Sequence, residues 1–384
     1  MTHPFRIAVI IPNYGFIGGG EGFAHDLTEK LSDYPQFEIH VLANKWQSDN
    51  NKIIFHRIPI LPFPKWLTVL SFALFIHYHL KRNEYDVIHS HERIFMADIF
   101  SVHSIPHEIW VYSVRRKKYP SLFDLATIWL EKKMYKNNRL KSILPVSTLS
   151  QALLQKSFDL EGKNVEVLPP GIDLKRFSAG EPERHFTKAE LGISADNICI
   201  LFAGMNFELK GLKQLIGAVG QIKNDEIRSS LRIVVAGKGK TEVFQNLADK
   251  LGLGGQLIFA GVRKDMEKMY QSCDFFVLPS GFDTFGMVVT EAMATSLPVI
   301  ISDQVGAKDL IQHGVNGFIC EQDDLSAISV CIEQLTNTER RKQMGQKAKQ
   351  AVSQLAWDEL AKKMADIYME TISKKCIKPS GSSC

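Results

Sequence analysis

Short apolar runs alternate with amphipathic helical segments along most of the chain. The runs in the first half that predict β-strands are residues 7–11, 38–43, 53–58, 86–89, 99–103 and 142–145. A second series consists of residues 198–203, 231–236, 256–260, 275–278 and 299–302. Strands that alternate with helices are typical of parallel sheets covered by helices on both faces. The pattern therefore predicts an α/β protein with two doubly wound, Rossmann-like domains.

A segment that contains proline and glycine separates the two series of strands. The segment 168–173 (LPPGID) closes the first series, and a polar stretch at 178–188 has the composition of a linker. A chain of 384 residues is long enough for two domains. We therefore predict an N-terminal domain over residues 1–178 and a C-terminal domain over 179–356. Residues 374–384 contain Gly and Ser and are expected to form a disordered tail.

The composition is that of a soluble globular protein, with 45% apolar and 23% charged residues. The six cysteines form no C-x-x-C pair, which argues against a zinc site and a disulfide framework and favours a reducing cytosol. Residues 3–6 lead straight into the first strand, so we expect no secretory signal before it. The longest apolar run, 66–76, is shorter than the roughly 20 residues that a membrane span needs. We expect residues 66–80 to form a buried helix instead.

The basic excess of the chain is local. Residues 111–141 contain nine Lys and Arg against two acidic residues, Asp124 and Glu131. Apolar residues recur there at near-helical spacing: Leu122, Leu125, Ile128, Trp129 and Met134. Two interpretations fit this pattern: a helix that lies on an anionic membrane surface, and a core-facing helix with a solvated basic rim. No known nucleic-acid-binding module accompanies the segment, so nucleic acid is not an expected partner.

Glycines and histidines follow the strands of the first half. Residues 13–21 form a glycine-rich loop between a strand and a helix, but their spacing is not that of a G-x-G-x-x-G dinucleotide fingerprint. His89, His91 and His103 come at the ends of predicted parallel strands, where open sheets bind ligands. Structural histidines in loops remain the alternative. Three histidines on separate strand ends do not establish a metal site.

The second half places polar loops at one sheet edge. Lys210 precedes a helix and could hold a pyrophosphate together with the helix amides. Asp283 lies before another helix and Glu291 lies inside it, and the amides near Phe285 and Gly286 would favour an anion. A carboxylate one or two turns along that helix could bind the two hydroxyls of a ribose. The pattern indicates a nucleotide-sugar site; an ordinary strand–loop–helix with two solvated acids remains the alternative.

These motifs together resemble one known family. The second half of the chain is similar to the donor half of the family 4 retaining glycosyltransferases, enzymes of the GT-B fold in which two Rossmann-like domains face each other across a cleft. Within the family, the chain is most similar to the glucosyltransferases that extend the lipopolysaccharide inner core, through residues 103–110 and the basic helix behind them. The motifs that carry the resemblance are 18–21 (GGGE), 86–91 (DVIHSH), 168–173 (LPPGID), 210–211 (KG), 285–286 (FG) and 291–292 (EA).

The resemblance implies a nucleoside diphosphate sugar donor, a UDP-hexose in the first instance. It implies that Glu291 holds the ribose hydroxyls and Lys210 the diphosphate, and that Asp283 contacts the transferred sugar with the amides of Phe285 and Gly286. The remaining implied positions are Val262 beside the base, His103 near the sugar O6 and anomeric centre, and Gly19 and Gly20 in the loop over the phosphates. Family members need no metal or other cofactor, and a final helix at about 357–372 packs back on the first domain.

The predicted activity is retaining transfer of a hexose to a lipid-linked saccharide such as the lipopolysaccharide core. Retention is expected to proceed by front-face attack, in which a phosphate oxygen takes the acceptor proton. The expected location is the cytoplasm, peripherally on the inner face of the membrane through about 111–141. The alternatives from other classes are a non-catalytic partner that keeps the GT-B fold and a sugar-nucleotide epimerase.

The chain departs from the family pattern around the donor. Asp283 stands where the family usually has Glu, so its carboxylate is one methylene shorter. Met205 and Leu209 occupy the two positions from which an Arg commonly joins the phosphate-binding Lys. These departures concern donor affinity and the identity of the sugar. The cations that could replace the Arg are Lys238, Arg263 and Arg176.

Overall fold

The computed structural model describes residues 3–16, 18–178 and 188–376. The chain forms two compact units, and the first contains both ends of the chain: residues 1–171 with 355–384, against residues 172–354 for the second. The boundaries predicted from the sequence, after 178 and after 356, differ from these because the chain leaves the first unit directly after the turn at Gly171. The polar stretch predicted as a linker lies largely outside the described residues.

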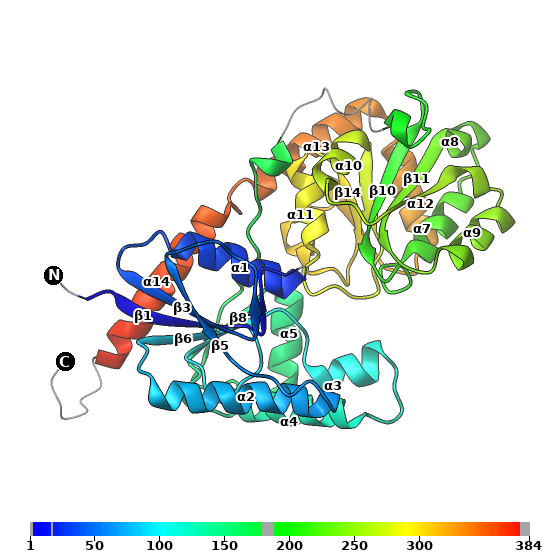
Figure 1. Cartoon of the computed structure of the whole chain (residues 1–384). Helices are drawn as coiled ribbons and strands as arrows, with labels where there is room; N and C mark the ends of the chain where they lie inside the picture. The colour runs from blue at the N-terminus through cyan, green and yellow to red at the C-terminus, as the bar shows by residue number, and fades with distance from the viewer. Residues whose placement is uncertain (1–2, 17, 179–187, 377–384) are drawn as a thin grey trace. The chain divides into compact units, whose positions relative to one another are not determined.

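A parallel sheet of seven strands forms the centre of the first unit, in the order β5-β3-β1-β6-β7-β8-β9 (Figure 1). The inner strand β1 is buried from Ile7 to Ile10 and pairs with β3 and β6. A small additional sheet joins β2 (Asn13–Tyr14) to β4 (Lys45–Trp46). The strands of the main sheet are β1 (Phe5–Ile10), β3 (Phe37–Ala43), β5 (Ile53–Arg57), β6 (Val87–Ser90), β7 (Ile99–Val102), β8 (Ser142–Pro145) and β9 (Asn164–Val165).

The last helix of the chain belongs to the first unit. It packs on α1 and β6, and the Tyr368 ring lies 5.6 Å from that of Phe37. Residues 374–376, predicted to be part of a disordered tail, form the end of this helix, while 377–384 lie outside the described residues. The helices of the unit are α1 (Gly19–Leu31), α2 (Lys65–Arg82), α3 (His107–Ile109) with the π-helical turn η1 (Trp110–Val114), α4 (Leu122–Tyr135), α5 (Thr148–Ser157) and α14 (Trp357–Cys376).

The prediction that residues 66–80 form a buried helix is wrong in part. The segment is the helix α2, and its core-facing side buries Phe72, Ile76 and Leu80. Leu74 and Tyr78, in contrast, are about half exposed, at 55% and 53%. A run of uniformly apolar residues does not reveal which side of a helix faces the core, because no polar face marks the other side. No helix among the described residues is long and apolar enough to cross a membrane.

The second unit contains a parallel sheet of six strands in the order β12-β11-β10-β13-β14-β15. Its strands are β10 (Ile198–Met205), β11 (Leu231–Lys238), β12 (Leu257–Gly261), β13 (Phe275–Leu278), β14 (Val299–Ser302) and β15 (Gly317–Cys320). Its helices are α7 (Leu212–Gly220), α8 (Asp225–Ser230), α9 (Thr241–Lys250), α10 (Met266–Ser272), α11 (Met287–Ala294), α12 (Leu325–Gln334) and α13 (Thr338–Val352), with 3₁₀ turns η2 (Arg176–Ser178), η4 (Gly254–Gln256) and η5 (Gly306–Leu310).

Both sheets have a topological switch point, where the strand order reverses. In the second unit it lies between β10 and β13, which are neighbours in the sheet although β11 and β12 come between them in the sequence. In the first unit it lies between β1 and β6. Ligands of open α/β sheets bind outside the carboxyl ends of the strands at such a point. The loops after these four strands are therefore the first places to look for a functional site.

Candidate functional site

Lys210 and Asp283 meet at the switch point of the second unit. Lys210 lies in the loop after β10 and Asp283 in the loop after β13, and Lys210 Nζ is 2.5 Å from Asp283 Oδ2. Both side chains are mostly buried, with exposed fractions of 19% and 16%. A pair at this distance is a charge-assisted hydrogen bond in a partly desolvated place. The structure thus brings together two of the side chains that the sequence predicted for the site.

Backbone bonds hold the loop of Asp283 in place. Its amide donates to the Gln304 carbonyl, its own carbonyl accepts from the Gly306 amide, and its Oδ1 accepts from the Phe285 amide at 3.3 Å. Phe285 is buried at 3% exposure and anchors the turn. The Asp283 carboxylate is therefore held in place by its own loop as well as by Lys210. Its orientation is fixed before a ligand binds.

Two glycines in the left-handed region begin the helices at the switch point. Gly286 has φ 87° and precedes α11, and Gly211 has φ 83° and precedes α7. A Cβ on Gly211 would lie 1.9 Å from the Pro279 carbonyl oxygen, so the loops after β10 and β13 touch there. Residues other than glycine are strained in this conformation. The two helix N-termini, with their amide dipoles, are thereby set beside the Lys210–Asp283 pair.

Glu291 lies on α11, one to two turns beyond Gly286. Its Oε2 accepts a hydrogen bond of 2.7 Å from the hydroxyl of Tyr270, which is completely buried on α10. Burial raises the pKa of Glu291, and nearby Glu267 raises it further, while the Tyr270 hydrogen bond and Arg176 oppose the rise. Among the described residues, Tyr270 is the one hydrogen-bond donor to this carboxylate. The acid is therefore oriented through one oxygen and can accept ligand hydroxyls at the other.

Of the three cations considered as replacements for the missing Arg, two are held by carboxylates. Arg263 donates to both oxygens of Asp265 at 2.8 and 2.6 Å, and Arg176 donates twice to Glu267. Lys238 is exposed at the end of β11 and has no carboxylate partner among the described residues. It pairs in register with Met205, one of the two positions where the Arg is missing. Lys238 is the cation of the three that the structure leaves available.

Val262 follows β12 and is 65% exposed. An exposed valine beside the polar loops gives a small apolar surface, as a base would need. That Val262 lies beside a base stays a prediction.

The first unit gathers His103 with two further histidines at its own switch point. The His103 Nε2 and His91 Nδ1 atoms are 2.9 Å apart and share a hydrogen bond, and the two rings are nearly parallel, at 5°. His89 hydrogen-bonds to the Tyr368 hydroxyl of α14 and to Ser101. Burial lowers the pKa of His103 to about 4 and that of His89 to about 3, so both imidazoles are neutral near pH 7.

The glycine-rich loop reaches this cluster. A Cβ on Gly20 would lie 3.2 Å from the His103 imidazole, whereas Gly19 has open space around it. Gly20 thus permits the start of α1 to approach the histidine closely, and a side chain there would have to displace His103. No group of three metal-ligating side chains with suitable geometry occurs in the part of the chain that the structure describes.

Two residues beside these clusters were not predicted from the sequence. Tyr270 orients Glu291, and Trp357 packs on Phe23 at 5.7 Å, beside the histidines. The sequence positions of both carry no motif. Tyr270 was hidden inside an amphipathic helix, and Trp357 lies at the other end of the chain, so no local signal could have found either.

Two family models match the chain one after the other. The model described as Glycosyltransferase Family 4 matches residues 17–176, and that of Glycosyl transferases group 1 matches residues 183–351. The two matches together cover most of the sequence and correspond to the two units of the structure. The chain therefore belongs to the two-domain glycosyltransferases of the GT-B type, which confirms the predicted fold class and family.

Relatives and solved structures agree with this assignment. D-inositol 3-phosphate glycosyltransferase of Corynebacterium kroppenstedtii is 27% identical over 227 residues, 56% of this chain and 50% of that protein. EpsD, a putative glycosyltransferase of Bacillus subtilis, is 32% identical over 211 residues, 54% of this chain and 55% of that protein. The chain thus aligns with about half the length of these two curated relatives. An uncharacterized glycosyltransferase of Methanocaldococcus jannaschii aligns over 339 residues, with 26% identity, 83% of this chain and 85% of that protein.

Two solved structures share the fold along nearly the whole chain. WaaG, a glycosyltransferase involved in lipopolysaccharide biosynthesis, superposes with a TM-score of 0.78 at 20% identity and covers 94% of this chain and 99% of its own. Anabaena Alr3699/HepE in complex with UDP-glucose superposes with a TM-score of 0.72 at 18% identity and covers 95% and 100%. At these identities the likeness concerns the fold.

Proposed function

We propose that this protein is a retaining glycosyltransferase that moves a hexose from a nucleoside diphosphate sugar, UDP-glucose or a related UDP-hexose, to a lipid-linked saccharide such as the lipopolysaccharide core. The observation that carries the proposal is the gathering of Lys210, Asp283 and Glu291 with the N-terminus of α11 at one switch point. The family supports glycosyl transfer, and the solved relative with UDP-glucose supports the donor class. WaaG supports the acceptor class.

Each group has a role that its position favours. Lys210 and the amides at the start of α11 stabilise the negative charge of the diphosphate, most of all as it leaves. Glu291 accepts the two ribose hydroxyls through the oxygen that Tyr270 does not occupy. Asp283, next to Lys210, accepts a hydroxyl of the transferred hexose. When the donor binds, Lys210 lies between the Asp283 carboxylate and the diphosphate. The lysine therefore connects the group that recognises the sugar with the leaving group that it stabilises.

The environment of Asp283 argues against its acting as a nucleophile. A carboxylate held 2.5 Å from Lys210 Nζ and bonded to the Phe285 amide has both oxygens engaged. Retention by front-face attack needs no protein nucleophile, because a phosphate oxygen of the donor takes the proton of the acceptor hydroxyl while the glycosidic bond to the diphosphate breaks. No metal or other cofactor is part of this proposal; Lys210 and the helix amides supply the positive charge.

His103 is proposed to contact the hexose. Its imidazole is neutral near pH 7 and its Nε2 is committed to His91, so it acts as a hydrogen-bonding partner and not as a cation. A neutral group of this kind recognises a hydroxyl such as the sugar O6 without competing with Lys210 for the phosphates. Gly19 and Gly20 are proposed to let the start of α1 approach the phosphates.

The donor class is tested by saturation-transfer NMR with a panel of UDP-hexoses, a GDP-hexose and free uridine. We expect strong transfer to the uridine and ribose protons of at least one UDP-hexose, weaker transfer to uridine alone, and little to the GDP-sugar. The diphosphate and the sugar each add contacts to those of the nucleoside, which is the reason for this order. Absence of binding by every nucleotide sugar would overturn the proposal.

Replacement of Lys238 by Ala is expected to weaken UDP binding about 5- to 10-fold and leave uridine binding unchanged, since a partly exposed cation beside a phosphate contributes roughly 1 kcal/mol. Isothermal titration with UDP and uridine measures the difference. Lys240→Ala is the matched control, because Lys240 is equally exposed two residues further along the same loop. Equal effects of the two substitutions would show that Lys238 contributes only general positive charge.

A second candidate is a non-catalytic protein of the same fold. Asp283 in place of Glu and the apolar residues at 205 and 209 favour it, because each weakens the donor site relative to the family pattern. Hydrolysis or transfer of a bound UDP-hexose separates the two candidates: a non-catalytic protein binds the donor and returns it intact, whereas the transferase releases UDP.

We propose that the basic segment 111–141 faces an anionic membrane surface, because a lipid-linked acceptor of the proposed class is held in a membrane. The structure turns some of its predicted apolar residues outward, with Leu122, Leu125 and Trp129 between 48% and 67% exposed. Met134 is buried in the core instead, so the segment combines features of both interpretations. Charge attraction by basic residues near such a surface is reversible and is weakened by salt.

A further inference from the structure

The exposed side of α2 and the turn before it form an apolar surface that the proposed function does not use. Leu74 and Phe75 are adjacent, and Tyr78 follows one helical turn later; the three side chains are 55%, 37% and 53% exposed. The turn that leads into the helix adds Leu61 and Phe63, the latter 84% exposed. Large apolar side chains that are exposed together on one face mark an interaction site more often than scattered ones do.

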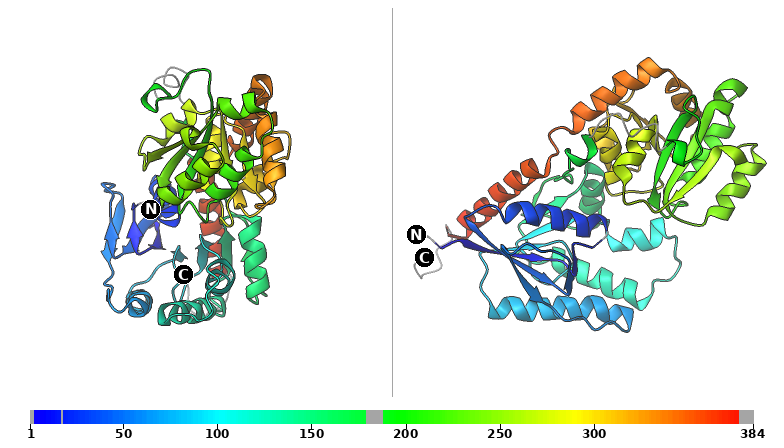
Figure 2. Two further views of the ribbon diagram at one scale, coloured as in Figure 1. Left: turned by 90° about the vertical axis from the view of Figure 1, so that its right-hand side faces the viewer. Right: turned by 45° about the horizontal axis from the view of Figure 1, so that its top comes forward.

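This surface continues onto α4. The two helices pack along each other, as Figure 1 and Figure 2 show. The ring of Phe95 lies between them, 6.0 Å from His77 of α2 and 5.8 Å from Trp129 of α4. Leu122, Leu125 and Trp129 face solvent on α4 at three- and four-residue spacing. The exposed apolar residues of α2 and α4 therefore belong to neighbouring elements of one unit; together with Leu61 and Phe63 we call them the α2–α4 surface.

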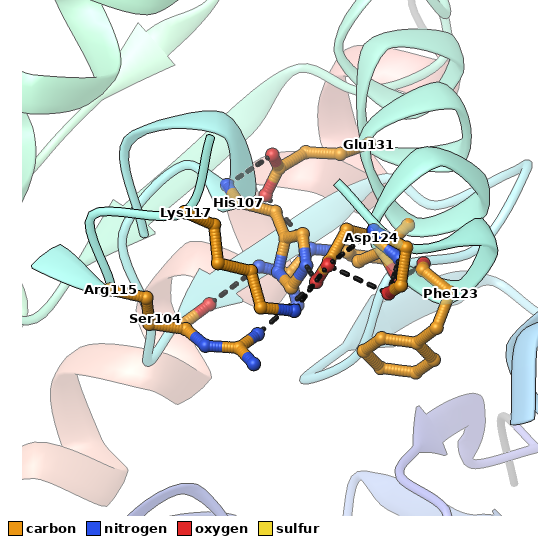
Figure 3. A network of polar contacts seen from close by, with 10 residues as sticks. Ser104, His107, Arg115, Lys117, Phe123, Asp124 and Glu131 are labelled. Carbon is orange, nitrogen blue, oxygen red and sulfur yellow. Dashed lines mark hydrogen bonds and ion pairs between the residues drawn. The ribbon is translucent and has the colours of Figure 1, made fainter. Parts of the chain in front are cut away.

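The two acids of the basic segment 111–141 are turned inward. Asp124 is completely buried and accepts from Lys117 at 2.9 Å, from Arg115 at 3.3 Å and from His107 at 3.1 Å (Figure 3). Burial raises the pKa of Asp124, but its capping box with Ser121 and the hydrogen bonds from Lys117 and His107 outweigh this effect and hold the pKa well below the usual range. Glu131 is buried as well, against Arg93 at 2.8 Å. The two acids of the basic segment are thus neutralised inside the unit.

Three cations of α2, α4 and the segment before α4 lie against exposed aromatic rings. α2 contains no acidic residue, and its Arg82 lies 3.9 Å from the centre of the Tyr78 ring. Lys133 lies over the ring of Trp129, and Lys118 over that of Tyr119. Exposed aromatic rings flanked by cations are the composition of a membrane–water interface, where the rings sit at headgroup level and the cations meet phosphates.

We propose that the α2–α4 surface lies on an anionic lipid bilayer, with α2 and the turn at 61–63 supplying the apolar contact and α4 most of the charge. The proposal rests on the proposed function insofar as a lipid-linked acceptor brings the enzyme to a membrane. A second copy of this chain is a poorer occupant: a two-fold contact places the same surface on both sides, so its basic residues would oppose one another. Glu108, an exposed acid beside α4, is already paired with Lys132 at 3.0 Å. Charge complementarity therefore selects the bilayer.

The test is co-sedimentation of the full-length protein with vesicles of phosphatidylcholine alone and with 30% phosphatidylglycerol, at low and high salt. The first variant, Phe75→Ser with Tyr78→Ser, removes apolar contact from α2. The second, Lys133→Gln with Lys136→Gln, removes charge from α4. Val243→Ser is the matched control, because Val243 is a comparably exposed apolar residue, at 58%, on α9 of the other unit. Circular dichroism checks that each variant folds.

We expect the α2 variant to bind anionic vesicles about 10-fold more weakly at both salt concentrations, since apolar contact is not screened. The α4 variant should lose binding chiefly at low salt, and the control should behave as the unchanged protein. The proposal is overturned if the α2 variant binds anionic vesicles as strongly as the wild-type protein does. It is also overturned if the wild-type protein does not bind the vesicles. A concentration-dependent dimer that the α2 substitutions dissociate overturns it in favour of a second copy.

Titration of the same variants with the UDP-hexose separates this proposal from the proposed function. Loss of vesicle binding with unchanged donor binding supports both. The protein could instead show the expected pattern of vesicle binding but bind no nucleotide sugar. This result would support membrane binding by the α2–α4 surface and overturn only the proposed function.

Discussion

Replacement of Glu291 by Ala is expected to reduce the affinity for a UDP-hexose by about 100-fold or more, because hydrogen bonds to a charged group contribute about 1.5–3 kcal/mol each and the carboxylate is proposed to accept two from the ribose. Isothermal titration with UDP measures the loss. Glu291→Gln is expected to lose less, since its amide oxygen still accepts one hydroxyl. Retained affinity in the Ala variant, with the fold intact, would remove Glu291 from the ribose site.

The same carboxylate predicts the pH dependence of donor binding. The pKa of Glu291 is raised by burial, so in the free protein it becomes protonated at a higher pH than an exposed glutamate. The neutral acid accepts the ribose hydroxyls poorly, and UDP affinity should fall as the pH decreases through that raised pKa. Tyr270→Phe removes the hydrogen bond that opposes the shift and should move the fall to higher pH. In Glu291→Gln this pH dependence should disappear.

Replacement of Lys210 by Met is expected to lower kcat/KM by about 100- to 1000-fold, the usual cost of removing a preorganised group that stabilises charge in the transition state. Two effects add in the same direction. The diphosphate loses its cation, and Asp283 is left as an unpaired, mostly buried carboxylate near the phosphates. Lys213→Met is the matched control, since Lys213 is exposed on α7 three residues away. Steady-state kinetics with the UDP-hexose measures both.

Asp283→Asn separates the two roles of this pair. Without the competing carboxylate, Lys210 is free to bind phosphate, so the affinity for UDP should stay equal or increase. The turnover of the UDP-hexose should decrease, because the contact to the sugar is weakened. In the double variant Lys210→Met, Asp283→Asn, UDP affinity should recover part of what the lysine substitution lost. A loss of UDP affinity in Asp283→Asn by itself would contradict the proposed division of roles.

The fold could be predicted from the sequence because its signals are local. Buried parallel strands such as β1 and β10 are short, apolar and bounded by glycine loops, and each signal lies within about ten residues. Lys210, Asp283 and Glu291 could be predicted as candidates for the same reason: each lies next to a strand end or near a helix start. Their proximity followed from topology, since the carboxyl ends of parallel strands share one edge.

The partners of these residues could not be predicted, because they depend on side-chain contacts across long stretches of sequence. Nothing local indicates that Lys210 reaches Asp283 or that Tyr270 reaches Glu291. The exposed side of α2 was missed because a uniformly apolar helix carries no polar stripe to reveal its orientation. Asp124 shows the same limit: the structure buries this acid of the basic segment against Lys117, Arg115 and the His107 imidazole, contacts that no local pattern indicates.

The return of α14 to the first unit determines the order in which the protein can be completed during synthesis. The sheet of that unit has been made by Gly171, yet the helix that covers α1 and β6 begins only at Trp357. The ribosome therefore finishes the entire second unit before Tyr368 can reach His89 and Phe37. Domains usually fold in the order in which they emerge. Here the unit that emerges first is completed last, because its histidine cluster gains the contact to Tyr368 only once α14 has been translated.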